Sequence, residues 1–502
     1  MSVEFAIIGL LSAPLLQALC VWALQRPPGL RDIIHIGFSI ASAVFAGRLV
    51  VAALHHESAR LAIAQPLPNV DLAFTVEPLG ALMAAVVAGL GVLHATHTSG
   101  IVRATHDKEP ARLMSFIALT NAATMAALLS ANLFTFFVAY QAITLTAFPL
   151  VAHRGEQPMQ RAARTFLATL LAASVGLFLP AMIWTYAISG ALDFQAGGVL
   201  AGHVDPISAN VLLLLFVFGL AMAALPPLHR WLTAAAVAPH PALVSLYALS
   251  VLPAGGVGVI KIAAYVFGPA LYDAALAARV LIVLAGISAC IAALIALSKQ
   301  DIRERLAYSC LAQAMAVILG AMLALPAGLF AAALQIVALA TASATLLMAT
   351  GTVSAITMRQ NAADFSGLGR VMPWTFAGFA VASASMIGMP PFAGAWAKLW
   401  LITATASRAA ASQAAAQPVQ SALFLASAGL IGVAAVLTFA HLGLLTANAL
   451  AGRAPTDAFR RPDGASILLA APVIACAAAT LWLLVLADPL ASFLSPMWTP
   501  PS

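Results

Sequence analysis

Helix-breaking and ionisable residues lie close together in two stretches of the sequence. In the first, Pro226-Pro227 precedes His229, and in the second, Pro390-Pro391 precedes Lys398. Proline lacks a backbone N–H and clashes with the preceding helical turn, so each pair should break the helix that contains it. Broken helices form the ion sites of many transporters. The two stretches therefore favour ion handling as the chemistry of this chain.

Few other groups in the apolar segments can carry or exchange a charge. Besides Lys398, the candidates for ion translocation are Lys261, His229, His441 and Gln141. Charged side chains inside a membrane are costly and usually functional. Lys398 is interpreted as a cavity-facing residue and Lys261 as a lysine that extends to the interface near the end of its span. Gln141 is either an interhelical hydrogen-bonding residue or the remnant of a titrating site.

The seventeen acidic residues all fall at the ends of predicted spans or in loops. Glu77, for example, is placed at the outer interface, at the start of the third span, where an anion suits a helix N-terminus. Both lysines are therefore expected to lack a carboxylate partner within the membrane.

Metal and redox chemistry are not indicated. The four cysteines, Cys20, Cys290, Cys310 and Cys476, fall in or beside different spans and form no CxxC pair. His94 and His97 are placed near span ends as interfacial polar residues, because no acidic residue stands at ligand spacing. The sequence therefore predicts no metal, no cofactor and no catalytic centre in this chain, and leaves open whether it belongs to a larger enzyme complex.

The composition predicts an all-α integral membrane protein. Of the 502 residues, 63% are hydrophobic and 8% charged, whereas soluble domains contain about 25% charged residues. Apolar runs of about 20 residues, long enough to span a bilayer, recur along the chain. We count fourteen, roughly at 4–24, 32–54, 73–98, 112–130, 131–152, 163–189, 207–237, 242–266, 275–297, 303–324, 327–356, 371–405, 420–447 and 465–487. Residues 1–502 are therefore expected to form a single membrane domain.

The basic residues mark one side of the membrane. The odd-numbered connections are rich in Lys and Arg, as at Arg103, Lys108 and Arg112, whereas the even-numbered ones hold only Arg60, Arg279 and Arg408. The positive-inside rule places the odd connections in the cytoplasm and both termini outside. The net charge of +6 is thus a topology signal and does not indicate nucleic-acid binding.

Three motifs resemble those of a known family. They are PPLHRWL followed by VAPHPALVSLYALSVLPAGGVGVIK, then SKQDIRERLAYSCLAQ, then LGRVMPWTFAGFAVASASMIGMPPFAGAWAKLWL. Together they resemble the proton-conducting, antiporter-like membrane subunits shared by complex I (NADH-quinone oxidoreductase) and the multisubunit Na+/H+ antiporters, with the third motif closest to the D-type branch of the antiporters. The resemblance implies about fourteen helices with two inverted five-helix repeats, at 112–266 and 274–447, each containing one broken helix.

The chain departs from this family at its charged relay positions. By alignment to the family motifs, neutral residues replace the titrating ones of spans five, seven, eight and eleven. These lost relay positions are Gln141, Met222, Tyr247, Pro253 and Ser343. The lysine after the second break is kept as Lys398. The resemblance therefore implies an impaired proton relay in the first half of the chain.

Three functional hypotheses remain. The first is an antiporter-like membrane subunit of a multisubunit proton- or cation-translocating or respiratory complex. The second is a non-conducting membrane scaffold, and the third is the membrane partner of an inorganic-carbon uptake complex. The expected partners are other membrane subunits, the lipid bilayer, and protons or monovalent cations, and the expected location is a bacterial inner membrane.

Overall fold

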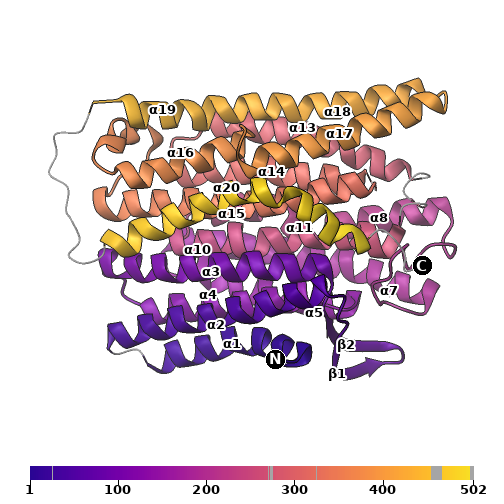
Figure 1. The fold of residues 1–502 in the computed structure, drawn as a ribbon, viewed down its shortest axis with the longest axis horizontal. Helices are drawn as coiled ribbons and strands as arrows, with labels where there is room; N and C mark the ends of the chain where they lie inside the picture. Colours follow the sequence, from indigo (N-terminus) through magenta and orange to yellow (C-terminus); the bar gives the residue numbers. More distant parts are fainter. Residues whose placement is uncertain (25–26, 269–270, 272–274, 324, 454–465, 498–502) are drawn as a thin grey trace.

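The chain folds into a bundle of long helices that run roughly parallel to one another (Figure 1). The computed structural model describes residues 1–24, 27–268, 271, 275–323, 325–453 and 466–497. The helices of the first half are α1 (Val3–Ala23), α2 (Pro28–Leu54), α3 (Pro78–Thr105), α4 (Pro110–Leu128), α5 (Leu133–Val151), α6 (Gln157–Ala173), α7 (Leu179–Ser189), α8 (Pro206–Gly219), α9 (Arg230–Ala235), α10 (His240–Val244) and α11 (Val251–Lys261). The second half contains α13 (Leu276–Ser298), α14 (Ile302–Met322), α15 (Pro326–Thr357), α16 (Pro373–Ile387), α17 (Ala393–Ala414), α18 (Pro418–Thr438), α19 (Leu444–Ala451) and α20 (Ser466–Leu494).

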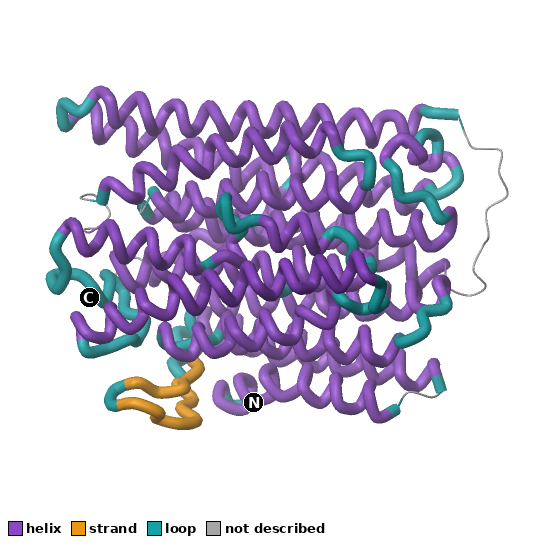
Figure 2. The backbone as a smooth tube through the Cα atoms, turned by 180° about the vertical axis from the view of Figure 1, so that it is seen from behind, coloured by secondary structure: helices purple, strands orange, loops and turns teal. Residues whose placement is uncertain are grey.

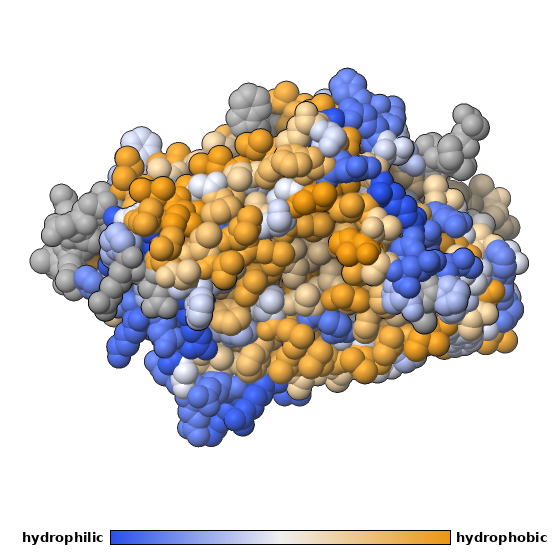
Figure 3. Space-filling view, turned by 90° about the horizontal axis from the view of Figure 1, so that it is seen from below, coloured by the Kyte–Doolittle hydropathy of each residue, from blue (hydrophilic) through white to orange (hydrophobic). Residues whose placement is uncertain are grey.

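The helices confirm the predicted all-α membrane class. In the described part of the chain, eleven helices are long and apolar enough to cross a membrane, and three shorter apolar helices lie at Pro206–Gly219, Pro373–Ile387 and Ile467–Leu481. Hydrophobic residues cover the middle of the face shown in Figure 3, and most hydrophilic residues lie toward its ends. The count of fourteen spans and the two repeats stay predictions, and residue 274, the predicted start of the second repeat, lies outside the described residues.

A β-hairpin corrects the predicted start of the third span. Strand β1 (Arg60–Leu67) pairs antiparallel with β2 (Val70–Thr75), with Arg60 opposite Thr75. The prediction that the span begins at residue 73 is therefore wrong. The helix begins only at Pro78, because proline suits the first helical position, where no N–H is needed.

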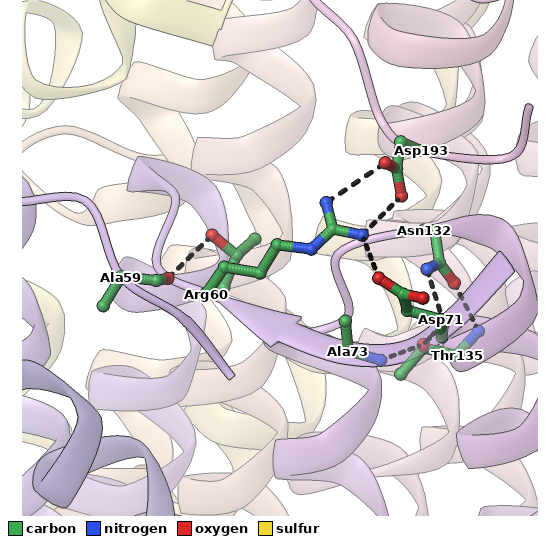
Figure 4. Close-up of polar contacts among 8 residues, drawn as sticks. Ala59, Arg60, Asp71, Ala73, Asn132, Thr135 and Asp193 are labelled. Carbon is green, nitrogen blue, oxygen red and sulfur yellow. Dashed lines mark hydrogen bonds and ion pairs between the residues drawn. The ribbon is translucent and has the colours of Figure 1, made fainter. Parts of the chain in front are cut away.

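Polar contacts fix the hairpin to the end of the bundle (Figure 4). The Arg60 guanidinium donates to both carboxylate oxygens of Asp193, at 3.1 Å each, and to Asp71 at 3.3 Å. Asn132 donates to the Asp71 carbonyl, while its own side-chain oxygen accepts from the Thr135 N–H and caps α5. The hairpin thus joins the start of α5 to the segment that follows α7.

Both double prolines interrupt helices inside the bundle, as predicted. Loop stretches occur between helices in its middle, away from both ends (Figure 2). Both Pro–Pro bonds are cis. The first break is wide, since α8 ends at Gly219, seven residues before Pro226. It can end early because side chains satisfy the freed backbone groups, as membrane burial requires. The Trp231 indole donates to the Ala221 carbonyl, and the Met222 N–H donates to the Tyr140 hydroxyl.

Gly255 lets α11 pack directly against the first break. A Cβ atom at this position would overlap the backbone of Met222 and Ala223. We therefore expect Gly255→Ala to lower the free energy of unfolding by about 1–3 kcal/mol, the usual cost of overpacking. Thermal unfolding of the detergent-solubilised protein measures this. Gly176→Ala is the matched control, since a Cβ there meets nothing within 4 Å. Equal melting temperatures for the two variants would contradict the close approach.

Candidate functional site

Lys398 is anchored to the backbone of the second break. Its amino group donates to the Met386 carbonyl and to Oε1 of Gln313, both at 3.0 Å. A helical carbonyl normally accepts from the residue four positions later, which for Met386 is Pro390, a residue without an N–H. The double proline therefore frees the acceptor that Lys398 uses. The lysine side chain also passes close to Gly388, whose φ is +93°.

Two glutamines complete a buried lysine cluster of Lys398, Gln313 and Gln335. Gln335 on α15 donates to the same Oε1 of Gln313 on α14, at 3.0 Å. All three residues are at most 9% exposed. Among the described residues, no carboxylate lies within 4.0 Å of the Lys398 amino group. A lysine held by neutral dipoles alone can lose and regain its proton without separating an ion pair.

The sequence does not predict Gln313 or Gln335 as site residues. Gln313 ends the LAYSCLAQ segment, which carries the family resemblance but contains no charged residue. The available signal was the position of both amides in uncharged, largely apolar stretches of their helices, where a buried polar side chain needs a partner.

The first break contains no buried lysine that corresponds to Lys398. Lys398 stands eight residues after Pro390, and the position eight residues after Pro226 is Ala234. Met222 and Tyr247 are fully buried, and the Tyr247 hydroxyl donates to the Leu232 carbonyl. Neutral side chains therefore occupy the interior of the first half around the break.

The other lost relay positions are also neutral and lie apart from the lysine cluster. Pro253 is buried within α11, and the Ser343 hydroxyl donates to the Leu339 carbonyl of its own helix. Gln141 is half-buried and accepts from the Ser174 hydroxyl at 3.2 Å. Its neighbour Tyr140, and not Gln141, contacts the first break.

Lys261 corrects two predictions. Its side chain is 1% exposed, and its amino group lies 2.6 Å from Oε1 of Glu77. It also donates to the carbonyls of Leu128 and Ser130, at 3.2 and 3.1 Å. The interpretation as an interfacial lysine without a carboxylate partner is therefore wrong. Glu77 stands at the start of α3, as predicted, and its carboxylate is largely buried beside Lys261 at the end of α11.

The two candidate histidines do not join the lysine cluster. His229 is half-buried at the start of α9. His441 is 1% exposed in a π-helical turn between α18 and α19, and its carbonyl accepts from Arg305 at 3.4 Å. Neither ring nitrogen of His441 has a partner within the described part of the chain.

His94 and His97 also differ from their predicted placement. Both are buried inside α3 and not at a span end. His94 Nε2 is 2.9 Å from the Pro241 carbonyl, and His97 Nε2 is 3.0 Å from the Thr352 hydroxyl. The helix continues beyond both residues to Thr105, because the third span starts and ends later than predicted.

Comparisons with known proteins agree with this architecture. NADH-quinone oxidoreductase subunit N of Desulforudis audaxviator is 26% identical, over 67% of this chain and 67% of the relative. NADH-quinone oxidoreductase subunit L of Mycobacterium tuberculosis is 27% identical, over 67% of this chain and 52% of the relative. The chain thus spans about half the length of some of the curated relatives it matches.

Solved structures share the fold. An Mrp complex from Dietzia sp. DQ12-45-1b contains a chain with a TM-score of 0.81 and 20% identity, matched over 100% of this chain and 52% of that one. A chain of the archaeal membrane-bound sulfane sulfur reductase has a TM-score of 0.79 and 21% identity, and the match covers 97% of both chains. A chain of respiratory complex I from Thermus thermophilus has a TM-score of 0.77 and 20% identity, and the match covers 97% of this chain and 99% of that one.

The match to a family model includes both breaks. The family model is described as "NADH:quinone oxidoreductase/Mrp antiporter, TM" and matches residues 130–445, more than half of the chain. The predicted resemblance is confirmed: this multi-pass membrane protein belongs to the NADH:quinone oxidoreductase/Mrp antiporter transmembrane family.

Proposed function

We propose that this chain is an antiporter-like membrane subunit of a multisubunit complex, and that it moves protons or another monovalent cation through its second half. The observation that carries the proposal is the buried amino group of Lys398, held at a helix break by one carbonyl and one amide oxygen. Intramembrane lysines of this kind are functional by default, because their burial is costly.

The proposed partners are other membrane subunits. Support comes from the printed names of the structural neighbours, which are complexes of several subunits. We also propose a bacterial inner membrane as the location. In this proposal, the hairpin, the start of α1 and the end of α20, which lie toward the same end of the bundle (Figure 1), face away from the cytoplasm.

A non-conducting scaffold is the second candidate. The neutral side chains around the first break favour it, since Met222, Tyr247 and Ala234 offer no group that titrates near neutral pH. In this alternative the chain keeps the architecture of the family and binds partner subunits that conduct.

Purification through a tag on this chain, followed by reconstitution into liposomes, separates the two candidates. The proposal expects co-purified membrane subunits, and an ion flux after a pH jump that falls when this chain is omitted and the other subunits are kept. Equal flux with and without this chain would overturn conduction and support the scaffold. Bicarbonate-dependent uptake in the same liposomes would instead support the inorganic-carbon alternative.

A further inference from the structure

Three histidines meet in the first half, outside the lysine cluster. They are His94 and His97 on α3 and His240 at the start of α10, and each is at most 8% exposed. His94 and His97 are three residues apart and so share one face of their helix. A Cβ atom placed on Gly351 of α15 would lie 2.9 Å from Cβ of His240 and 3.4 Å from Cε1 of His97. His94 contacts the carbonyl of Pro241, the residue after His240. We call these three residues the histidine cluster.

Hydrogen bonds identify which ring nitrogens are free to accept a proton. The Thr352 hydroxyl donates to the Met348 carbonyl, so it accepts from His97 Nε2–H. The neutral His97 ring therefore carries its proton on Nε2 and presents a lone pair at Nδ1. Within the described residues, His97 Nδ1 and His240 Nε2 are buried and have no hydrogen-bond partner. Buried polar atoms without partners are rare in proteins and call for an explanation.

A polar pocket leads from one end of the bundle to the cluster. The pocket has a volume of about 60 Å³, and His240 is among its lining residues. Three charged residues line it as well, Asp107, Arg154 and Arg303. They come from the third, fifth and ninth connections, on the side that the basic residues predict to be cytoplasmic. The pocket thus joins the cluster to that side.

The cluster has other titratable neighbours. His153 donates to Asp107 at 3.1 Å. Burial alone would raise the pKa of Asp107, but hydrogen bonds from His153 and the Glu109 N–H lower it below its usual value. Asp301 pairs with Arg303 at the start of α14. On α2, His35 bonds to Gln17, and Asp32 pairs with Arg31 and with Arg103 of α3. Among the described residues, these acids form their ion pairs with arginines or with His153, and none of them forms one with a histidine of the cluster.

The polar track ends before the opposite side. Beyond His240, the polar side chains along the same helical segment are Ser245, then Tyr247, whose hydroxyl donates to the Leu232 carbonyl. Ser250 follows and donates to Asn121 at 3.3 Å. From Val251 to Ile260 there is no polar side chain, and the segment is fully buried. Protons that reach the cluster from the pocket therefore have no onward acceptor along this helix before Lys261, whose amino group is already paired with Glu77.

We propose that His240, His97 and His94 form a one-sided proton-binding site, which takes up protons from the end of the bundle with the basic connections and does not pass them across. An imidazole suits this role, because the pKa of a free imidazole lies near physiological pH and each of its two nitrogens can bond to a different partner. The site stands apart from conduction at Lys398 and does not depend on it.

Nitrogen-15 NMR of histidine-labelled protein in oriented liposomes tests the site, since imidazole nitrogen shifts separate neutral from protonated rings. The expected result is that His97 and His240 signals, assigned by their loss in single variants, respond when the pH on the basic side falls from about 8 to about 5. They should not respond to the same change on the opposite side. In His240→Gln, the response of His97 should slow at least tenfold. His203→Gln, an exposed residue at the other end, is the control.

Two results of the NMR experiment would overturn the proposal. The first is that the His97 and His240 rings stay neutral at every pH, and the second is that they respond only to the pH on the opposite side. The Lys398→Gln variant keeps this test separate from the proposed function. The histidine response should be unchanged in that variant, whether or not its ion flux is lost. Transmembrane flux should in turn be unchanged in His240→Gln, and a matching loss of flux would show that the site conducts and is not one-sided.

Discussion

Replacement of Lys398 by glutamine should lower the ion flux of the reconstituted complex at least about tenfold, because a positioned proton-transfer group typically contributes about a hundredfold or more. Glutamine keeps one donor for the Met386 carbonyl or the Gln313 amide, so the second break should keep its shape. It cannot bind or release a proton near neutral pH. The loss of flux should therefore appear without loss of assembly.

The measurement is the rate of internal pH change in liposomes after a pH jump. Lys108→Gln is the matched control, because it makes the same chemical change on a residue of the α3–α4 connection, away from the lysine cluster. Thermal unfolding and subunit composition of both variants confirm that assembly is intact. A Lys398→Gln complex with the flux of the Lys108→Gln complex would remove Lys398 as an ion-handling residue.

Replacement of Glu77 by glutamine should have the largest effect on stability. The variant leaves the Lys261 ammonium buried without its anion, and breaking a buried pair in this way typically costs about 3–5 kcal/mol. The carbonyls of Leu128 and Ser130 remain as acceptors, so the lower end of this range is expected. Chemical unfolding in detergent micelles measures the loss.

A double-mutant cycle distinguishes the ion pair from general damage to the fold. Lys261→Met alone should also destabilise, and the double variant Glu77→Gln/Lys261→Met should recover most of the loss, because no uncompensated charge stays buried. Glu109→Gln, which breaks the exposed pair with Arg112, should cost no more than about 1 kcal/mol. Additive effects of the two single substitutions would show that the Glu77–Lys261 pair is not coupled.

The sequence predicts both breaks for a local reason, and the same reason explains the acceptor that the structure shows at the second one. Proline removes a specific hydrogen bond four residues back, so Pro390 identifies Met386 as the residue with a free carbonyl. The position of Lys398 one to two turns later places its amino group within reach of that carbonyl. Features set by covalent geometry over a dozen residues can be predicted from one chain.

The Glu77–Lys261 pair is of a different kind. The two residues are far apart in sequence, and each stands at the end of a predicted span, where an interfacial position is the ordinary expectation. Only the packing of α3, α11 and the turn at Ser130 brings them together. The same holds for the histidine cluster, since the contact of His97 with Thr352 depends on the packing of α3 against α15.

The hairpin was missed because its pattern competes with that of a helix. Residues 70–75, VDLAFT, are mostly apolar and lie only two residues before the start of α3 at Pro78. Short apolar runs fit either type of element when read alone. The pairing with β1 and the contacts of Asn132 and Thr135 with Asp71 select the strand.

The central claim is that ions cross the membrane through the second half of the chain and not through the first. Proton flux of two variants, measured side by side in the same reconstituted complex, tests it most directly: Lys398→Gln in the second half and Gln141→Leu in the first. The account predicts that Lys398→Gln loses at least about nine-tenths of the flux, whereas Gln141→Leu keeps the flux of the unmodified complex. Loss of flux in Gln141→Leu, with flux retained in Lys398→Gln, would contradict it.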